Sequence, residues 1–184
     1  MKLYSMGFAQ KFSNFASSTL SIRISMSDKW EYKRTAREFV IQFLYGPQFP
    51  HGNEDLLDPK SALGRLDEFV ESYSLPDHEN PHPELTEQVK FLARKWIQEI
   101  LGSLDSLRDT ITPRLKGTSW SNVKKIERTI LLMSVHELLT DKELAPNIII
   151  NEAVELAKKY GSAESHSFVN GVLDAIKREE RSSN

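Results

Sequence analysis

The chain has 184 residues, of which 39% are hydrophobic and 27% charged, a balance that predicts one soluble domain or at most two small ones. It contains no run of about 18 apolar residues that could span a membrane, and its net charge of −2 means that any affinity for nucleic acid must come from a local basic cluster. Cysteine is absent, which excludes disulfides, thiolate nucleophiles and cysteine-bound metals and suits a reducing cytosol.

The first 26 residues differ from the rest because they are rich in Ser and Phe and lack Asp and Glu. Their three cations are Lys2, Lys11 and Arg23. This composition is typical of an organellar transit peptide. The alternative is that Met26 is the true start, since Ser27-Asp28 can cap a helix. We expect residues 1–26 to be a disordered extension or a misassigned start, and residues 27–181 to form the folded domain.

From Ser27 onward, apolar residues recur every three or four positions, which predicts helices almost throughout. The first stripe is Phe39, Val40, Phe43 and Leu44; the second is Leu63, Leu66, Val70 and Tyr73; the third is Leu85, Val89, Leu92, Trp96 and Ile100. Gly102-Ser103 breaks the third helix before a fourth, which carries Leu104, Leu107, Ile111 and Leu115. Clusters of Pro, Gly and Asn predict loops at 46–59, 74–83 and 112–119.

Three more helices are predicted in the last third. One runs from about Ser121 to Thr140. The next begins near Pro146 and ends at Gly161, because proline suits the first turn of a helix and glycine suits its end. The last helix has the stripe Phe168, Val169, Val172, Leu173 and Ile176, which we expect in the core. We therefore predict an all-α fold, a compact bundle of about seven helices, with two packed subbundles divided near Gly102 as the alternative.

Patterns for catalysis and metal binding are weak. The fragment 116–118, Lys-Gly-Thr, lacks the glycines of a phosphate-binding loop. His78 and His82 have the spacing of a zinc pair, but prolines on both sides of His82 forbid the helix that would align them. Ser165 and His166 are adjacent, yet adjacency supplies no catalytic geometry, and Ser165 suits the N-cap of the last helix. We predict that the protein is not an enzyme and that it has no catalytic residue, bound metal or cofactor.

A basic cluster opens the first helix. Its cations are Lys29, Lys33, Arg34 and Arg37. They share an arc of about 140° on a helix with 100° per residue. Such a helix can pack its apolar second half on the bundle and offer its first half to phosphates, releasing counterions at each contact. Glu31 and Glu38 interrupt the cluster, so by spacing alone an ordinary solvated face is the alternative.

Two stretches carry a family resemblance. Residues 33–45 read KRTAREFVIQFLY, and residues 150–161, INEAVELAKKYG, are followed at 165–174 by SHSFVNGVLD. Both resemble signatures of the NusB family of bacterial transcription antitermination factors, whose usual opening is a basic run, then AR, then two turns ending in Q-x-L-Y. The resemblance extends from about Arg34 to Ile176 and is diffuse between Gly46 and Trp120.

The resemblance implies an all-α cytoplasmic protein that binds the boxA element of nascent RNA together with ribosomal protein NusE. In the family, this assembly keeps RNA polymerase in an antitermination complex, chiefly on ribosomal RNA operons. Two departures predict a lower intrinsic RNA affinity here. Thr35 stands where the family often has another arginine, and Leu132 replaces an arginine common in the fifth helix.

The resemblance also implies site residues. The turn before the last helix, with Glu164, Ser165 and His166, is expected to join the basic helix in RNA contact, and helix N-terminal N–H groups favour phosphate oxygens. Positions matching Tyr45 and Glu127 face NusE in the family. We expect a NusE-binding surface at these two residues and the neighbouring Arg128; the alternative is exposed helix residues with no partner.

Two other functions remain open from the sequence. One is a NusB-like helical scaffold that binds proteins with weak or no RNA binding, which the weakened basic run favours. The other is the N-terminal domain of a ribosomal RNA cytosine methyltransferase, which would require a Rossmann-like domain after residue 184. The sequence leaves open whether the free protein forms a homodimer.

Overall fold

The computed structural model describes residues 26–46, 59–73 and 85–182. The chain divides into two compact units, Met1–Trp30 and Glu31–Asn184, and the hydrophobic core belongs to the second. Within the described ranges no helix is both long and apolar enough to cross a membrane.

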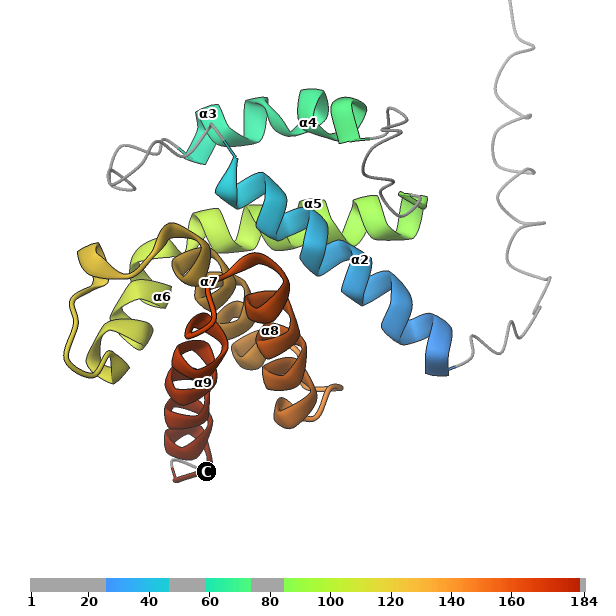
Figure 1. The fold of residues 1–184 in the computed structure, drawn as a ribbon. Helices are drawn as coiled ribbons and strands as arrows, with labels where there is room; N and C mark the ends of the chain where they lie inside the picture. The colour runs from blue at the N-terminus through green and yellow to red at the C-terminus, as the bar shows by residue number, and fades with distance from the viewer. Residues whose placement is uncertain (1–25, 47–58, 74–84, 183–184) are drawn as a thin grey trace, which may run out of the picture. The chain divides into compact units, whose positions relative to one another are not determined.

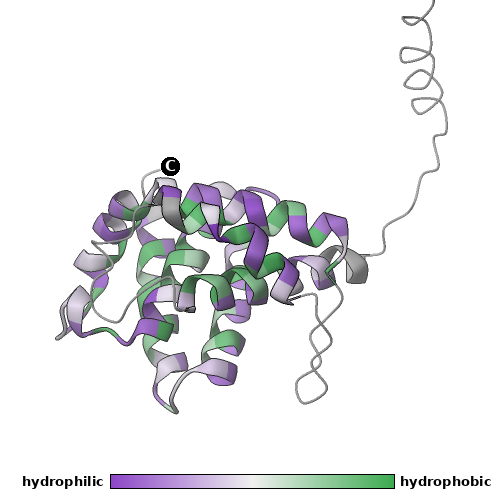
Figure 2. Ribbon diagram, turned by 90° about the horizontal axis from the view of Figure 1, so that it is seen from above, coloured by the Kyte–Doolittle hydropathy of each residue, from purple (hydrophilic) through white to green (hydrophobic). Residues whose placement is uncertain are grey.

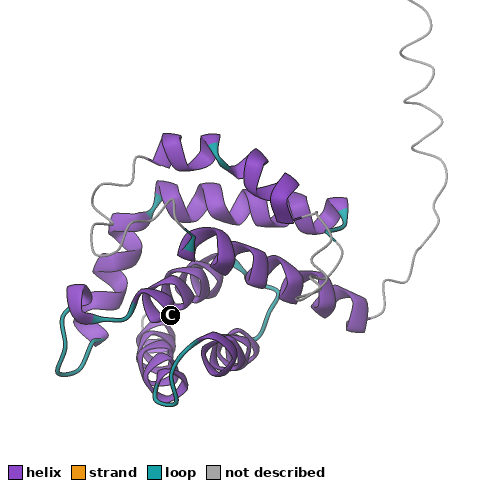
Figure 3. Cartoon of the chain, turned by 45° about the horizontal axis from the view of Figure 1, so that its top comes forward, coloured by secondary structure: helices purple, strands orange, loops and turns teal. Residues whose placement is uncertain are grey.

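The described residues form eight α-helices and two short 3₁₀ helices and contain no strand (Figures 1 and 3). The helices are α2 (Met26–Tyr45), α3 (Pro59–Gly64), α4 (Leu66–Tyr73), α5 (Glu87–Gly102), α6 (Leu104–Ile111), α7 (Lys125–Thr140), α8 (Pro146–Tyr160) and α9 (Ser165–Ser182). The 3₁₀ helices are η2 (Thr112–Arg114) and η3 (Trp120–Asn122). The all-α prediction is confirmed. One predicted helix is divided at Arg65 into α3 and α4, which follow each other almost in line (Figure 1).

Helix α7 is the centre of the bundle. It packs against α5, α6, α8 and α9, and every residue from Glu127 to Glu137 is buried. The sequence pattern predicted one apolar face for this helix, but its neighbours cover it on all sides. Figure 2 shows the resulting contrast between apolar inner segments and hydrophilic outer faces. Polar residues of α7 are therefore buried with the apolar ones.

The second half of α2 packs on α4 through aromatic side chains. The Phe39 ring lies 5.1 Å from that of Phe69 and 5.0 Å from that of Tyr73, and Phe43 lies 5.3 Å from Phe69, all edge to face. This geometry is favourable for aromatic pairs beyond the area that they bury. The prediction that the apolar second half of α2 packs on the bundle is therefore confirmed.

The turn between α8 and α9 depends on Gly161. A Cβ atom at this position would lie 2.5 Å from the Ser165 Cβ and 2.6 Å from the Ala157 carbonyl oxygen, so a side chain does not fit. The predicted end of α8 at Gly161 is confirmed. Helix α9 begins at Ser165 itself, which places Ser165 in the first turn rather than at the N-cap. Phe168 is partly buried and packs against the core, so its predicted place in the core is confirmed in part.

Candidate nucleic-acid interface

The basic cluster predicted at the start of α2 is mostly turned into the bundle. The side chain of Lys29 lies outside the described residues. Lys33 is buried, and its ammonium forms an ion pair with Asp141, directly after α7. Burial raises the pKa of Asp141, but hydrogen bonds from Lys33 and from two backbone N–H groups outweigh this effect and lower it overall. The expectation that Lys33 is an exposed cation is therefore wrong.

Arg37 forms the most deeply buried ion pair described. Its side chain is 2% exposed and that of Glu137, on α7, is 1% exposed. Arg37 Nε donates to Glu137 Oε2 at 2.8 Å and Nη2 to Oε1 at 2.6 Å, while Nη1 lies 3.4 Å from Glu152 Oε2 on α8. A charge taken from water needs such partners, and here one guanidinium joins three helices. The expectation that Arg37 faces solvent is wrong, because α7 covers it.

Among the described side chains of the predicted cluster, that of Arg34 reaches the surface. Its side chain is 64% exposed, and Nε and Nη2 donate to the Glu152 carboxylate at 3.1 and 2.7 Å. The Arg34 hydrogen bonds hold the pKa of Glu152 below its usual value against the opposing effect of burial. Because the guanidinium remains largely open to solvent, it can also bind a phosphate.

A second cation lies along the same helix pair and was missed from the sequence. Lys159, near the end of α8, has a side chain that is 55% exposed, and its Nζ donates to both carboxylate oxygens of Glu38 on α2 at 2.9 and 3.0 Å. These hydrogen bonds raise the pKa of Lys159. No local sequence pattern identifies this contact, because the partner on α2 is 121 residues away.

The turn before α9 exposes two of its three predicted residues. Ser165 is fully buried: its Oγ donates to Glu127 Oε1 at 2.7 Å and accepts from the Ser162 N–H at 2.9 Å. The expected exposure of its hydroxyl is wrong. Glu164 is exposed, and hydrogen bonds from its own backbone N–H and the Ser162 hydroxyl lower its pKa. His166 is partly exposed, with Nδ1 3.3 Å from the Ser167 hydroxyl.

The predicted partner surface is reduced to Tyr45. Glu127 and Arg128 are buried because they lie on the central helix α7. The Arg128 guanidinium instead lies over the Trp120 ring, 5.9 Å from its centroid. Tyr45 is 45% exposed and contacts the first turn of α7, where the Lys125 ammonium lies 5.1 Å from the ring centroid. Tyr45 and the start of α7 are thus adjacent.

Glu127 has a structural role. Its carboxylate accepts from the Lys124 backbone N–H at 3.3 Å and so caps α7, and its other oxygen accepts from Ser165. Lys124 in turn donates from Nζ to Ser162 Oγ at 2.8 Å. The start of α7 and the turn before α9 are therefore held together by hydrogen bonds.

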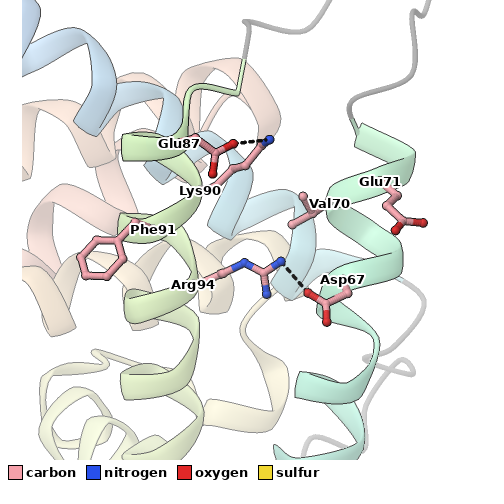
Figure 4. Close-up of a pocket in the computed structure, with 7 residues that line it drawn as sticks. All are labelled: Asp67, Val70, Glu71, Glu87, Lys90, Phe91 and Arg94. Carbon is pink, nitrogen blue, oxygen red and sulfur yellow. Dashed lines mark hydrogen bonds and ion pairs between the residues drawn. The ribbon is translucent and has the colours of Figure 1, made fainter. Parts of the chain in front are cut away.

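A separate groove of about 540 Å³ lies between α4 and α5 (Figure 4). Its cations are paired within it: Lys90 with Glu87 at 2.8 Å and Arg94 with Asp67 at 2.5 Å. The groove contains none of the predicted site residues. The histidines 78 and 82, considered as a zinc pair, lie outside the described residues, and in the described ones no group of three His, Asp or Glu is arranged for a metal.

Comparison with known proteins gives one family. The sequence profile of the NusB family matches residues 34–178. The transcription antitermination protein NusB of a Nitratiruptor species is 34% identical over 152 residues, which are 80% of this chain and 92% of that protein. T. maritima NusB superposes with a TM-score of 0.63 at 28% identity, covering 80% of this chain and 91% of that chain. The fold is also that of a structure of antitermination factors NusB and NusE in complex with double-stranded RNA, with a TM-score of 0.62, 24% identity and coverage of 81% and 98%.

Proposed function

Because the chain belongs to the NusB family, we propose that it is a transcription antitermination factor that binds boxA RNA together with ribosomal protein NusE. In this role it keeps RNA polymerase processive within an antitermination complex, chiefly on ribosomal RNA operons. It acts in the cytoplasm and catalyses no reaction. The observation that carries the proposal is the family match over residues 34–178, which includes Arg34, Tyr45 and the turn before α9.

The RNA surface of this proposal consists of Arg34 together with Glu164 and His166. The exposed guanidinium of Arg34 supplies charge for a phosphate, while His166 and the anionic Glu164 are suited to ribose or base groups. Lys33 and Arg37 contribute indirectly, because their ion pairs fix α2 against α7 and α8. This division replaces the four-cation face expected from the sequence.

The NusE surface of this proposal is centred on Tyr45. An exposed tyrosine beside a lysine offers an apolar ring and a polar edge, a combination common at protein interfaces. Glu127 is buried and supports this surface indirectly, since it caps α7 and accepts a hydrogen bond from Ser165. A change at Glu127 is therefore expected to affect both surfaces, which differs from a purely partner-facing role.

The RNA part of the proposal is tested by salt-titrated binding of boxA RNA and of a scrambled RNA of equal length. Arg34→Ala should weaken boxA binding. The slope of log affinity against log salt concentration should become shallower by about 0.7, the value for one lost phosphate contact to a single strand. Arg65→Ala is the matched control, because it removes an exposed arginine at the α3–α4 junction. Equal boxA affinity in the Arg34 variant and the parent would contradict the assignment.

The NusE part is tested by calorimetry on each binary pair and on the ternary complex. Binding free energies are reciprocal, so NusE should raise boxA affinity by the factor by which boxA raises NusE affinity. Tyr45→Ala should weaken NusE binding and leave binary boxA affinity unchanged. If NusE binds the parent and the Tyr45 variant equally, the proposed surface is wrong.

One observation favours a second function, a helical scaffold that binds proteins with weak or no RNA binding. Lys33 and Arg37 are committed to internal ion pairs, and Thr35 and Leu132 are buried, uncharged residues at positions where the family often has arginine. The same assays separate the two functions. NusE binding without measurable boxA affinity, alone or in the ternary mixture, would favour the scaffold.

A further inference from the structure

Besides the buried Arg37–Glu152 contact, two ion pairs with exposed cations join α2 to α8. They form one line of contact, here called the α2–α8 seam and made of Arg34 and Glu38 on α2 and Glu152 and Lys159 on α8. Arg34 pairs with Glu152 at 2.7 Å, and Lys159 pairs with Glu38 at 2.9 Å. Arg34 and Glu38 are one helical turn apart, and Glu152 and Lys159 are two turns apart. Both pairs therefore lie on the facing sides of the same two helices. In each pair the cation is exposed and its carboxylate is largely covered.

Lys159 lies between the two parts of the RNA surface proposed above. Arg34 marks one end of that surface, and the turn with Glu164 marks the other. Helix α8 ends at Tyr160, one residue after Lys159, and leads directly into this turn. A strand that follows α8 from Arg34 to this turn therefore passes Lys159.

We propose that Lys159 binds an RNA phosphate and that Glu38 competes with the RNA for its ammonium. The proposal rests on the RNA-binding function proposed above and names a contact and an internal competitor within it. A carboxylate and a phosphate offer the same charge-assisted acceptors to an ammonium, so one can replace the other. The Glu38 carboxylate accepts two hydrogen bonds from Lys159 and lies 3.4 Å from the Tyr160 hydroxyl, which keeps it in place.

The expected size follows from counterion release. One phosphate contact with single-stranded RNA contributes a salt slope of about 0.7, which corresponds to about a fivefold gain in affinity between 1 M and 0.1 M salt. Lys159→Ala should thus weaken boxA binding about fivefold at 0.1 M salt and make the logarithmic slope shallower by about 0.7. Glu38→Gln keeps an oxygen acceptor for Lys159 and Tyr160 but removes the competing charge, so it should strengthen binding by up to about the same factor.

The chain offers a matched control on the same helix. Lys158 is exposed to a similar extent and pairs at 2.7 Å with Glu155, but this pair lies within α8 and does not involve α2. Lys158→Ala and Glu155→Gln change the charge of the protein by the same amounts as Lys159→Ala and Glu38→Gln. They therefore measure the general effect of charge on RNA binding.

The experiment measures salt-titrated affinity of the full chain for boxA RNA and for a scrambled RNA, with melting temperatures for every variant. The proposal expects Lys159→Ala to weaken binding more than Lys158→Ala, and Glu38→Gln to strengthen it more than Glu155→Gln. In the Lys159→Ala background, Glu38→Gln should give no more than the Glu155→Gln effect, because there is no ammonium left to compete for.

Several results would overturn the proposal. Equal effects of Lys159→Ala and Lys158→Ala on boxA affinity would contradict the proposed phosphate contact of Lys159. The RNA-binding function would still stand as long as the parent binds boxA. A full Glu38→Gln gain in the Lys159→Ala background would show simple repulsion between Glu38 and RNA rather than competition. Absence of boxA binding by the parent, with and without NusE, would overturn both this proposal and the proposed function.

Discussion

Replacing Arg37 with alanine should destabilise the fold far more than replacing Arg34. The Arg37 side chain is 2% exposed, and its loss would leave Glu137, itself 1% exposed, as a buried carboxylate without its guanidinium. Breaking a buried pair from one side costs about 3–5 kcal/mol, because the remaining charge is uncompensated. For a unit of this size, that loss lowers the melting temperature by about 6–20 °C. Arg34→Ala removes the same charge from a side chain that is 64% exposed and leaves Glu152 with Arg37 as a partner, so it should cost about 0–1 kcal/mol.

The assay is urea denaturation followed by circular dichroism, with thermal melts in parallel. The double variant Arg37→Met with Glu137→Leu tests the cause, since it removes both charges and keeps apolar volume. It should recover most of the loss. A loss below about 1 kcal/mol for Arg37→Ala would refute the buried ion pair and return Arg37 to the list of candidate phosphate contacts. The result also decides how RNA-binding data are interpreted, because a destabilised Arg37 variant cannot report on direct contact.

Three further predictions concern stability. Gly161→Ala should lose about 1–3 kcal/mol, measured by urea denaturation, because its Cβ would meet the Ser165 Cβ at 2.5 Å and the backbone at 2.6 Å; an unchanged midpoint would mean that the turn rearranges freely. The pKa of Glu152 in the folded protein is below its usual 4.5, so its contribution to stability is fully present above pH 4.5 and is lost as the pH falls through the lower folded value. Glu152→Gln should therefore lose less stability than the parent when unfolding is measured at decreasing pH below 4.5, and equal losses would contradict this linkage. Phe168→Ala should cost less than about 3 kcal/mol, because the ring is only partly buried, and a loss of about 3–5 kcal/mol would indicate a fully packed ring.

The sequence by itself determined the helical fold and most of its divisions. Apolar residues at three- and four-residue spacing predicted the helices, while Pro146 and Gly161 marked the limits of α8. These signals are local: helical periodicity, proline in a first turn and a glycine stop act over a few residues. The start of α7 was misplaced by several residues, because it was predicted from about Ser121 but lies at Lys125, after the short η3 segment.

The tertiary structure alone decided which polar residues reach the surface. Lys33 and Arg37 find their carboxylates 108 and 100 residues away, and no local pattern connects such partners. Glu127 lies beside an apolar stripe and would be exposed on a peripheral helix. It is buried because α7 is surrounded on all sides. Periodicity identifies the apolar face of a helix, whereas the burial of its other faces depends on how many neighbours the complete fold places around it.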